Sequence, residues 1–302
     1  MAPAIFGMEL IILGEGLAEF ETTSVPISLA LVYLVTNVST HSVLDAQAQI
    51  ESVETELRIA SKIQADALPP VAPEFANHLD LNLRGSMTTA KEVGGDFYDY
   101  FAIDNNRLCF LIADVSGKGT PAALFMMTCK TMIKDYALTK NNTSEIFTTV
   151  NARLCENNDE GMFATAWIGI LDTRTMTLQY TNAGHNYPYL QRKGQPSCII
   201  EKNHGLFLGG LEFTQYKQDE IHLDPGDRIL LYTDGVVEAH DKSGRLYGND
   251  RLEKMLDSSR NLTGEQVLQQ ILNDVNVFAA GVPQFDDITM IVLSIKNQEE
   301  NT

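Results

Sequence analysis

The sequence is poor in basic residues, and this shortage excludes several classes of partner. Its 302 residues include 22 Lys and Arg against 40 Asp and Glu, which gives a net charge of −18. Nucleic acid phosphates and anionic membrane surfaces attract proteins through an excess of Lys and Arg, which this chain lacks. We therefore expect no nucleic acid among its partners.

Cysteine and histidine are also scarce and show no spacing typical of a metal site. The four cysteines (109, 129, 155 and 198) are scattered with no CxxC pair, and the six histidines are equally dispersed. We interpret the cysteines as reduced thiols of a cytoplasmic protein. A zinc site of the Cys and His type is not expected.

Long apolar runs are missing as well. The longest candidate, from Val25 to Val35, is well short of the ~20 residues that a spanning helix needs. The N-terminus has no basic region, and acidic residues interrupt its apolar stretches, so no secretory signal is predicted. We therefore expect a cytoplasmic chain with no membrane span.

The chain is long enough for one large domain and an N-terminal extension. Residues 1–42 are apolar but irregular and stay unassigned, although residues 27–38 fit either a buried helix or a strand. Residues 43–70 have apolar positions at alternating steps of three and four, which predict a linker helix that Pro69 and Pro70 end. These positions are Ile50, Val53, Leu57, Ala60, Gln64 and Ala67. The spacing fits a homodimeric coiled coil through residues 43–68 as well as a helix packed on its own domain.

Residues 71–298 have the pattern of a mixed domain. Strands are predicted at 79–85, 96–103, 108–113, 162–171, 177–182, 228–233 and 288–295. Helices are predicted at 121–139, 144–156 (with Ser144 as the N-cap), 249–258 and 263–278. Because strands and helices come in groups and do not alternate, we expect an α+β layered sandwich and no βαβ repeat.

The sequence is rich in acidic residues. Four acidic clusters each lie inside or at the end of a strand-like run. They cover residues 92–99, 114–119, 232–235 and 286–289. One Asp at a strand end is usually a turn residue or a helix cap, but four such clusters beside core strands are hard to explain as turns alone. A buried carboxylate must be paired, protonated or bound to a cation, and no matching set of Lys or Arg is present. The clusters therefore predict a site for hard divalent cations, Mg²⁺ or Mn²⁺.

In order and spacing these clusters resemble the PPM-type metal-dependent serine/threonine phosphatases, in the SpoIIE/RsbU branch of bacterial stress and sporulation regulators. The matching motifs are GGDFYD at 94–99, DVSGKG at 114–119 with PAA at 121–123, NAGHN at 182–186, YTDG at 232–235 with Glu238, and DDIT at 286–289. The resemblance covers about residues 60–296, and Tyr187 is a minor departure where the motif usually has a proline. It implies a four-layer α-β-β-α sandwich, here with an N-terminal helical segment.

The resemblance also implies a metal site and roles for its residues. Asp114 would bridge two Mn²⁺ or Mg²⁺ ions, with the Val115 carbonyl as a further ligand. Asp234 and Asp286 would complete the coordination, and Asp96 would bind one ion directly or through water. Asp287 would lie behind the ligands, although the sequence alone does not separate it from Asp286. These carboxylates would act in catalysis through a water held by the ions, and whether a third ion binds is left open.

Two further residues of the motifs have open roles. His185 is interpreted as structural, with a catalytic role as the alternative. Lys118 would either attract the phosphate or brace its own glycine-rich turn, and the sequence does not decide between these roles.

The implied activity is that of a cytoplasmic protein serine/threonine phosphatase. Its substrate would be a phosphorylated STAS-domain anti-anti-sigma protein, in the partner switching that controls a bacterial sigma factor, and the helix over 43–68 would transmit a signal. The alternative is a scaffold or binding module with the phosphatase fold and reduced catalysis, which the loss of a metal-binding acid would mark, and none is lost. A nucleotidyl cyclase would need an acidic residue between Asp96 and Phe97, which is missing.

Overall fold

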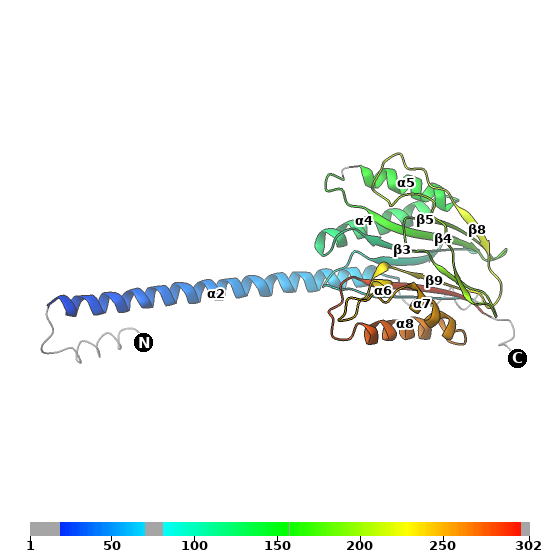
Figure 1. The fold of residues 1–302 in the computed structure, drawn as a ribbon. Coiled ribbons are helices and arrows are strands. Elements are labelled where there is room, and N and C mark those ends of the chain that lie inside the picture. The colour runs from blue at the N-terminus through cyan, green and yellow to red at the C-terminus, as the bar shows by residue number, and fades with distance from the viewer. Residues whose placement is uncertain (1–18, 70–80, 157, 297–302) are drawn as a thin grey trace. The chain divides into compact units, whose positions relative to one another are not determined.

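The computed structural model describes residues 19–69, 81–156 and 158–296 (Figure 1). The chain divides into two compact units, residues 1–59 and 60–302, and each is considered by itself. Most of α2 (Glu19–Ala67), the first helix of the described residues, belongs to the first unit. The second unit contains all the strands and the remaining helices of the described residues.

Helix α2 confirms the helix predicted over residues 43–68 and extends it toward the N-terminus. The strand alternative for residues 27–38 is wrong, because these residues are helical. Their predicted burial is wrong as well, since Leu31, Val32 and Tyr33 are 61%, 59% and 59% exposed. Among the described residues, none of the helices combines the length and the apolar character that crossing a membrane requires.

The last turns of α2 have a different environment from its middle. From Ala60 onward the helix belongs to the second unit, where Gln64 is 6% exposed and Leu68 packs against apolar cores. Earlier on the same heptad face, Ile50 and Val53 are 58% and 53% exposed. The two interpretations of the heptad spacing therefore apply to different stretches. The end of the helix packs within its own domain, and the earlier stretch has an uncovered apolar face.

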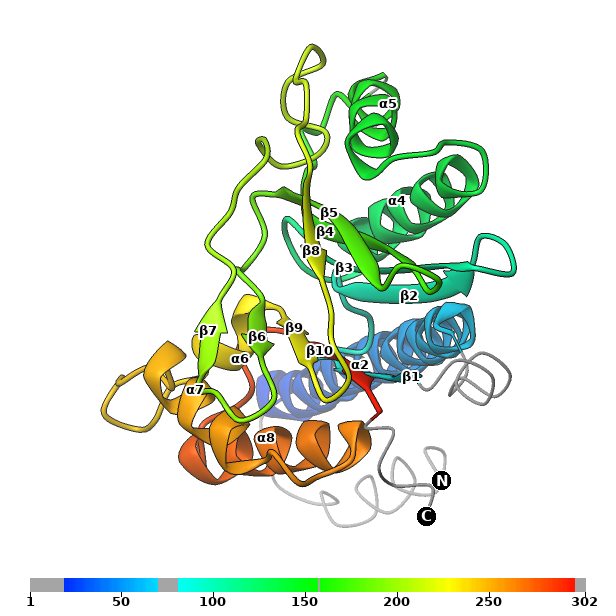
Figure 2. The same ribbon diagram turned by 90° about the vertical axis from the view of Figure 1, so that its right-hand side faces the viewer.

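Two five-stranded antiparallel sheets form the centre of the second unit (Figure 2). The first sheet has the order β2-β3-β4-β5-β8, with β2 (Phe97–Ala102), β3 (Arg107–Val115), β4 (Ala164–Asp172), β5 (Thr177–Ala183) and β8 (Asp219–His222). The second has the order β1-β10-β9-β6-β7, with β1 (Leu81–Thr88), β10 (Ile288–Ile295), β9 (Arg228–Tyr232), β6 (Tyr189–Gln191) and β7 (Ser197–Ile199).

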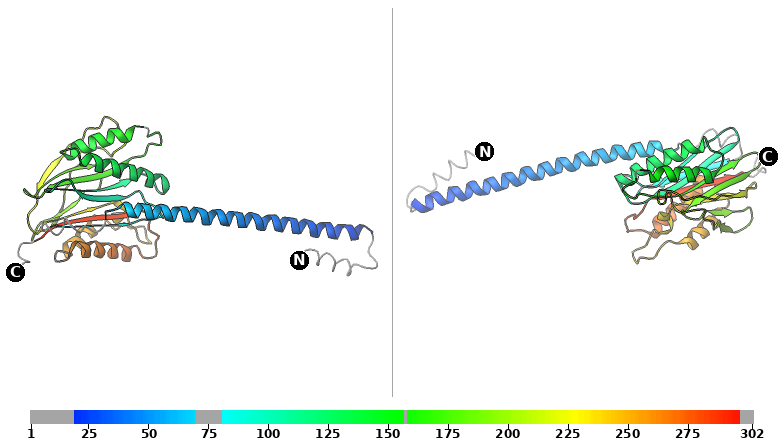
Figure 3. Two further views of the ribbon diagram at one scale, coloured as in Figure 1. Left: turned by 180° about the vertical axis from the view of Figure 1, so that it is seen from behind. Right: turned by 90° about the horizontal axis from the view of Figure 1, so that it is seen from above.

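Helices cover the outer face of each sheet and complete four layers, which the views from behind and above also show (Figure 3). Helices α4 (Thr120–Ala137) and α5 (Thr143–Cys155) lie on the first sheet, and α7 (Asn249–Ser258) and α8 (Gly264–Phe278) lie on the second. Apolar side chains fill the three spaces between layers, with Trp167 and Phe110 fully buried between the sheets. Because the central strands bury both faces, their sequences are continuous apolar runs. The architecture is the expected α-β-β-α sandwich.

Most predicted elements occur within a few residues of their expected ends, and the differences have local causes. The cap of α5 is Asn142, whose side chain accepts a hydrogen bond from the Glu145 backbone N–H, so the prediction of Ser144 as the cap is wrong. Strands β6, β7 and β8 were not predicted, because runs of three or four residues have too little periodicity. Residues 79 and 80 of the first predicted strand lie outside the described residues.

Candidate metal centre

Strand pairing brings the first two acidic clusters together. In the β2–β3 pair Phe97 is opposite Ala113, so Asp96 and Asp114 lie at the same end of neighbouring strands. Asp96 is only 1% exposed. A Cβ atom at Gly95 would lie 2.8 Å from the Val115 carbonyl oxygen, so only glycine lets this loop pack against the end of β3.

The other two acidic clusters meet at the edge of the second sheet. Tyr232 pairs with Met290 in β9 and β10, and the Thr233 N–H extends the ladder by donating to the Thr289 carbonyl at 3.0 Å. Asp234 follows as the first residue of the short helix α6 (Asp234–Val237). The Asp286–Asp287 pair precedes β10. A Cβ at Gly235 would clash with the Asp287 carbonyl oxygen, so this contact requires glycine.

Hydrogen bonds connect the two edges across the sheets. The Thr233 hydroxyl donates to Asp96 Oδ2 at 2.7 Å. The Asp287 carboxylate accepts from the backbone N–H groups of Ala90 and Gly95, each at 2.8 Å. Since both Asp287 oxygens serve this connection, its environment supports the interpretation that it lies behind the ligands and braces the loop that carries Asp96.

The clustered carboxylates raise one another's pKa. Burial, followed by the charges of Asp234 and Asp286, raises the pKa of Asp114 to about 7. Burial and then the charge of Glu238 raise the pKa of Asp234 to about 6. Burial and the charge of Asp114 hold the pKa of Asp96 well above its usual value. Carboxylates that destabilise one another near neutral pH form a site that a bound cation would stabilise.

Lys118 faces this cluster from a glycine-rich turn. Gly117 and Gly119 on either side of it have φ angles of 84° and 77°, a left-handed backbone that favours glycine. Lys118 Nζ lies 2.8 Å from Asp286 Oδ2 and donates to the Phe285 carbonyl at 2.6 Å. It also lies 3.9 Å from the centre of the Phe285 ring. Of the two roles left open by the sequence, these contacts favour bracing over phosphate capture.

The carboxylates assemble at one edge without adopting a ready coordination geometry. Across the described parts of the chain, no group of three or more His, Cys, Asp or Glu side chains is placed to hold an ion. The contacts explain this, because Asp286 is paired with Lys118, Asp96 with Thr233 and Asp287 with backbone amides. The donors still fit a hard divalent cation, since they are all oxygens and carry excess negative charge. A cation bound by Asp286 would compete with Lys118 for this carboxylate.

His185 lies in a buried turn and is neutral at physiological pH. Its Nδ1 is 2.9 Å from the Thr165 hydroxyl, and its backbone N–H donates to Asn182 Oδ1 at 2.7 Å. Burial lowers its pKa to about 3. This environment fits the structural interpretation, because the ring is buried and its lowered pKa makes it a weak base at neutral pH.

Two residues at the site had no assigned role from sequence. The Gln64 amide forms two hydrogen bonds with the backbone of Gly94, donating to its carbonyl at 2.8 Å and accepting from its N–H at 3.0 Å. The sequence feature that indicates this contact is the polar residue Gln64 at a heptad position that is otherwise apolar. Glu238 acts on Asp234 through its charge. The sequence feature that indicates this role is the position of Glu238 four residues after Asp234 in the matching motif.

The family model of stage II sporulation protein E (SpoIIE) matches residues 104–296 of this chain. The chain belongs to the SpoIIE family. The chain is therefore a PPM-type serine/threonine phosphatase, as the order of the acidic motifs predicted.

Individual proteins and solved structures that are similar to this chain extend the comparison. Phosphoserine phosphatase RsbU of Bacillus subtilis is 28% identical over 246 residues, which are 82% of this chain and 72% of RsbU. Protein IcfG of Synechocystis sp. is 30% identical over 266 residues, which are 79% of this chain but 41% of IcfG. Among solved structures, the SiaA-PP2C domain of Pseudomonas aeruginosa has a TM-score of 0.71 at 21% identity, covering 82% of this chain and 98% of that domain. The last similarity supports the fold.

Proposed function

We propose that this SpoIIE-family phosphatase hydrolyses a phosphoserine or phosphothreonine of a STAS-domain anti-anti-sigma protein, with Mn²⁺ or Mg²⁺ held by the acidic cluster. The observation that carries the proposal is the assembly of Asp96, Asp114, Asp234 and Asp286 from both sheets, with pKa values that rise for three of them. The relative RsbU is named a phosphoserine phosphatase, which supports the substrate class.

Each acidic residue has a distinct place in the proposed centre. Asp114 and the adjacent Val115 carbonyl at the end of β3 would be ligands of the two ions. Asp234 and Asp286 would complete the coordination from the second sheet, and Asp96 would bind one ion directly or through water. Asp287 stays with the backbone amides and keeps the Asp96 loop in position.

The chain's own residues prepare this site for phosphoryl transfer to water. When bound, the two ions would supply an acidified water near neutral pH and positive charge for the phosphoryl oxygens. Thr233 orients Asp96 by donating to Oδ2, and Gly95 and Gly235 allow the close approach of backbone to carboxylate. The raised pKa values mean that the metal-free cluster retains protons near neutral pH, and these must leave when a cation enters.

The proposed setting is cytoplasmic partner switching that controls a sigma factor. We infer that the chain forms a homodimer through residues 43–68, centred on the exposed heptad positions Ile50 and Val53. An uncovered apolar face of this kind supports association with a second copy. The alternative, a scaffold with reduced catalysis, is less well supported because all four acidic ligands are present.

The proposal is tested by phosphate release from a phosphorylated STAS-domain protein in the presence of Mn²⁺. The wild-type chain should hydrolyse it, and Asp114→Asn and Asp234→Asn should each lower kcat/KM by about 100-fold or more, since loss of groups behind the ligands already costs ~10–100-fold. Asp135→Asn is the matched control, because Asp135 is an exposed residue of α4. Unchanged hydrolysis by Asp114→Asn and Asp234→Asn would contradict the assignment.

A further inference from the structure

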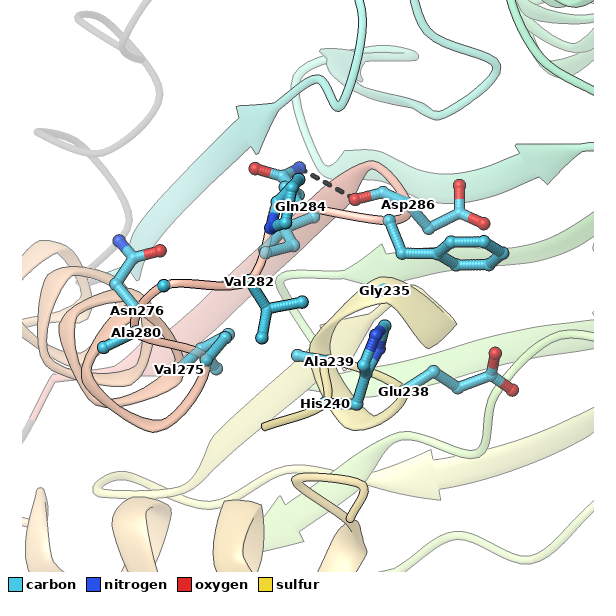
Figure 4. A pocket seen from close by; sticks show the side chains of 15 residues that line it. Gly235, Glu238, Ala239, His240, Val275, Asn276, Ala280, Val282, Gln284 and Asp286 are labelled. Carbon is cyan, nitrogen blue, oxygen red and sulfur yellow. Dashed lines mark hydrogen bonds between the residues drawn. The ribbon is translucent and has the colours of Figure 1, made fainter. Parts of the chain in front are cut away.

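A small pocket lies directly beside the acidic cluster (Figure 4). It is formed by α6 and the residues that follow it, by the C-terminal end of α8, and by the loop that leads to β10. Asp286, and Gly235 next to Asp234, belong to the wall of the pocket as well as to the cluster. The Gln284 side chain donates to the Asp286 carbonyl at 2.8 Å and holds the loop in place. A group bound here would therefore be adjacent to the reacting phosphate.

Apolar and acidic side chains both line the pocket. Val282 and Phe285 contribute apolar surface, and Phe285 is 64% exposed, whereas Val275 and Ile288 in the lining are buried. In Figure 4 the carboxylates of Glu238 and Asp286 extend toward the same side of the pocket. A ligand with an apolar body and one charged end fits this arrangement.

The charged side chains that line the pocket determine whether the charged end of the ligand is positive or negative. The charged or titratable side chains lining the pocket are Glu238, Asp286 and His240. Asp286 already has the Lys118 ammonium at 2.8 Å, and the His240 ring packs edge-on against Phe285 at a centroid distance of 6.2 Å. The exposed Glu238 side chain makes neither an ion pair nor a hydrogen bond with any residue that the structure describes. The uncompensated charge is therefore negative, and its complement is a cation.

The volume of the pocket suits one side chain of a bound protein. It encloses about 150 Å³. That is room for about five waters at ~30 Å³ each, and it is below the ~300 Å³ at which pockets for small organic ligands begin. A lysine or arginine can bury its methylene stem in such a space and keep its charged end at the edge.

We propose that this pocket is a specificity subsite that takes a lysine or arginine of the phosphoprotein substrate, close in sequence to the phosphorylated residue. The stem lies against Val282 and Phe285, and the cation pairs with Glu238. The inference rests on the proposed function, because it places the phosphate at the acidic cluster that shares Asp286 with the pocket. Because the pocket and the cluster share Asp286, and an extended chain spans ~3.3 Å per residue, we place the basic residue within about three positions of the phosphoserine.

The test uses synthetic phosphoserine peptides in which one residue is varied. The varied residue is placed, one peptide set at a time, at each of the three positions before and the three positions after the phosphoserine. Each position carries lysine or norleucine, which has a similar apolar stem but no charge, and kcat/KM is measured with Mn²⁺. At one position lysine should be favoured about 10-fold, and in Glu238→Gln this ratio should fall to about 1, as expected for loss of a charge-assisted contact. The ratio within each variant is independent of any change in metal binding.

Charge reversal and a matched control complete the experiment. Glu238→Lys should invert the preference, so that a glutamate peptide exceeds the lysine peptide at that position. Glu265→Gln should keep the lysine preference, because Glu265 is exposed in the first turn of α8, at the opposite end from the pocket. Equal hydrolysis of all peptides by the wild type, or a lysine preference that persists in Glu238→Gln, would overturn the subsite but leave the phosphatase assignment intact. Hydrolysis of none of the peptides would overturn the subsite, and if the phosphorylated STAS-domain protein is not hydrolysed either, the proposed function is overturned as well.

Discussion

Asp114 shows at the scale of a single residue why the acidic cluster needs a cation. It lies at the end of the buried strand β3, and burial with its acidic neighbours raises its pKa to about 7 from an ordinary value of 3.8. The folded chain therefore binds more protons than the unfolded chain between these two values. Stability from this group is present at low pH and is lost as the pH rises toward 7, which is the reverse of a salt-bridged carboxylate.

We predict that Asp114→Asn stabilises the metal-free chain at pH 8, because it removes a buried charge from a group of like charges. The expected gain in the free energy of unfolding is about 1–3 kcal/mol, at roughly 2–4 °C in Tm per kcal/mol, and it should vanish near pH 4. Thermal unfolding in the presence of a chelator measures it, with Asp135→Asn as the unaffected control. A lower Tm for Asp114→Asn at pH 8 would show that the cluster is not under electrostatic strain.

The acidic residues themselves could be predicted from the sequence, whereas their individual contacts could not. Carboxylates flanked by glycine at the ends of apolar runs are enough to indicate a buried acidic site. The role of Asp287 depends on two backbone N–H groups almost two hundred residues away in the chain, Ala90 and Gly95. Likewise, nothing local in the sequence shows that Lys118 pairs with Asp286.

At the scale of the element, α2 combines two environments in one helix. Its heptad pattern predicted a helix, but periodicity shows only which face of the helix is apolar and not what packs against that face. Gln64, near the C-terminal end, forms paired hydrogen bonds with Gly94, two residues before Asp96. The final turns of α2 therefore hold the loop of the acidic cluster, whereas Ile50 and Val53 are exposed.

We predict that Val53→Asp dissociates a dimer formed through α2, because it places a charge in the proposed apolar seam. Sedimentation velocity should show a dimer for the wild-type chain and a monomer for the variant. Thr55→Asp is the matched control, since residue 55 lies about 200° around the helix from Val53. A wild-type monomer, or a dimer unaffected by Val53→Asp, would exclude this seam.

At the scale of the whole molecule, the fold gathers residues from four separated stretches of sequence into one edge of a sandwich. The sequence predicted the layers because central strands that are buried on both faces are continuous apolar runs, such as 108–113 and 288–295. It did not predict the pocket beside the cluster, because its lining comes from α6, α8 and a loop that only tertiary packing brings together. Topology therefore determines the neighbourhood of the site, and the motifs determine its chemistry.

The net charge of −18 is also a property of the whole molecule. A phosphoserine that approaches this chain meets an excess of negative charge, and a lysine or arginine beside the phosphoserine would reduce the repulsion between them. The proposed contact with Glu238 is thus consistent with the charge of the entire chain.

Calorimetric titration of Mn²⁺ into the metal-free chain tests the central claim most directly, because it measures the metal centre independently of any substrate. The account predicts at least two ions bound per chain, with proton release near pH 7 as the raised pKa values of Asp114 and Asp234 fall on binding. Asp114→Asn should lose most of this binding, and Asp135→Asn should retain it. The absence of Mn²⁺ binding by the wild-type chain, or undiminished binding by Asp114→Asn, would contradict the account.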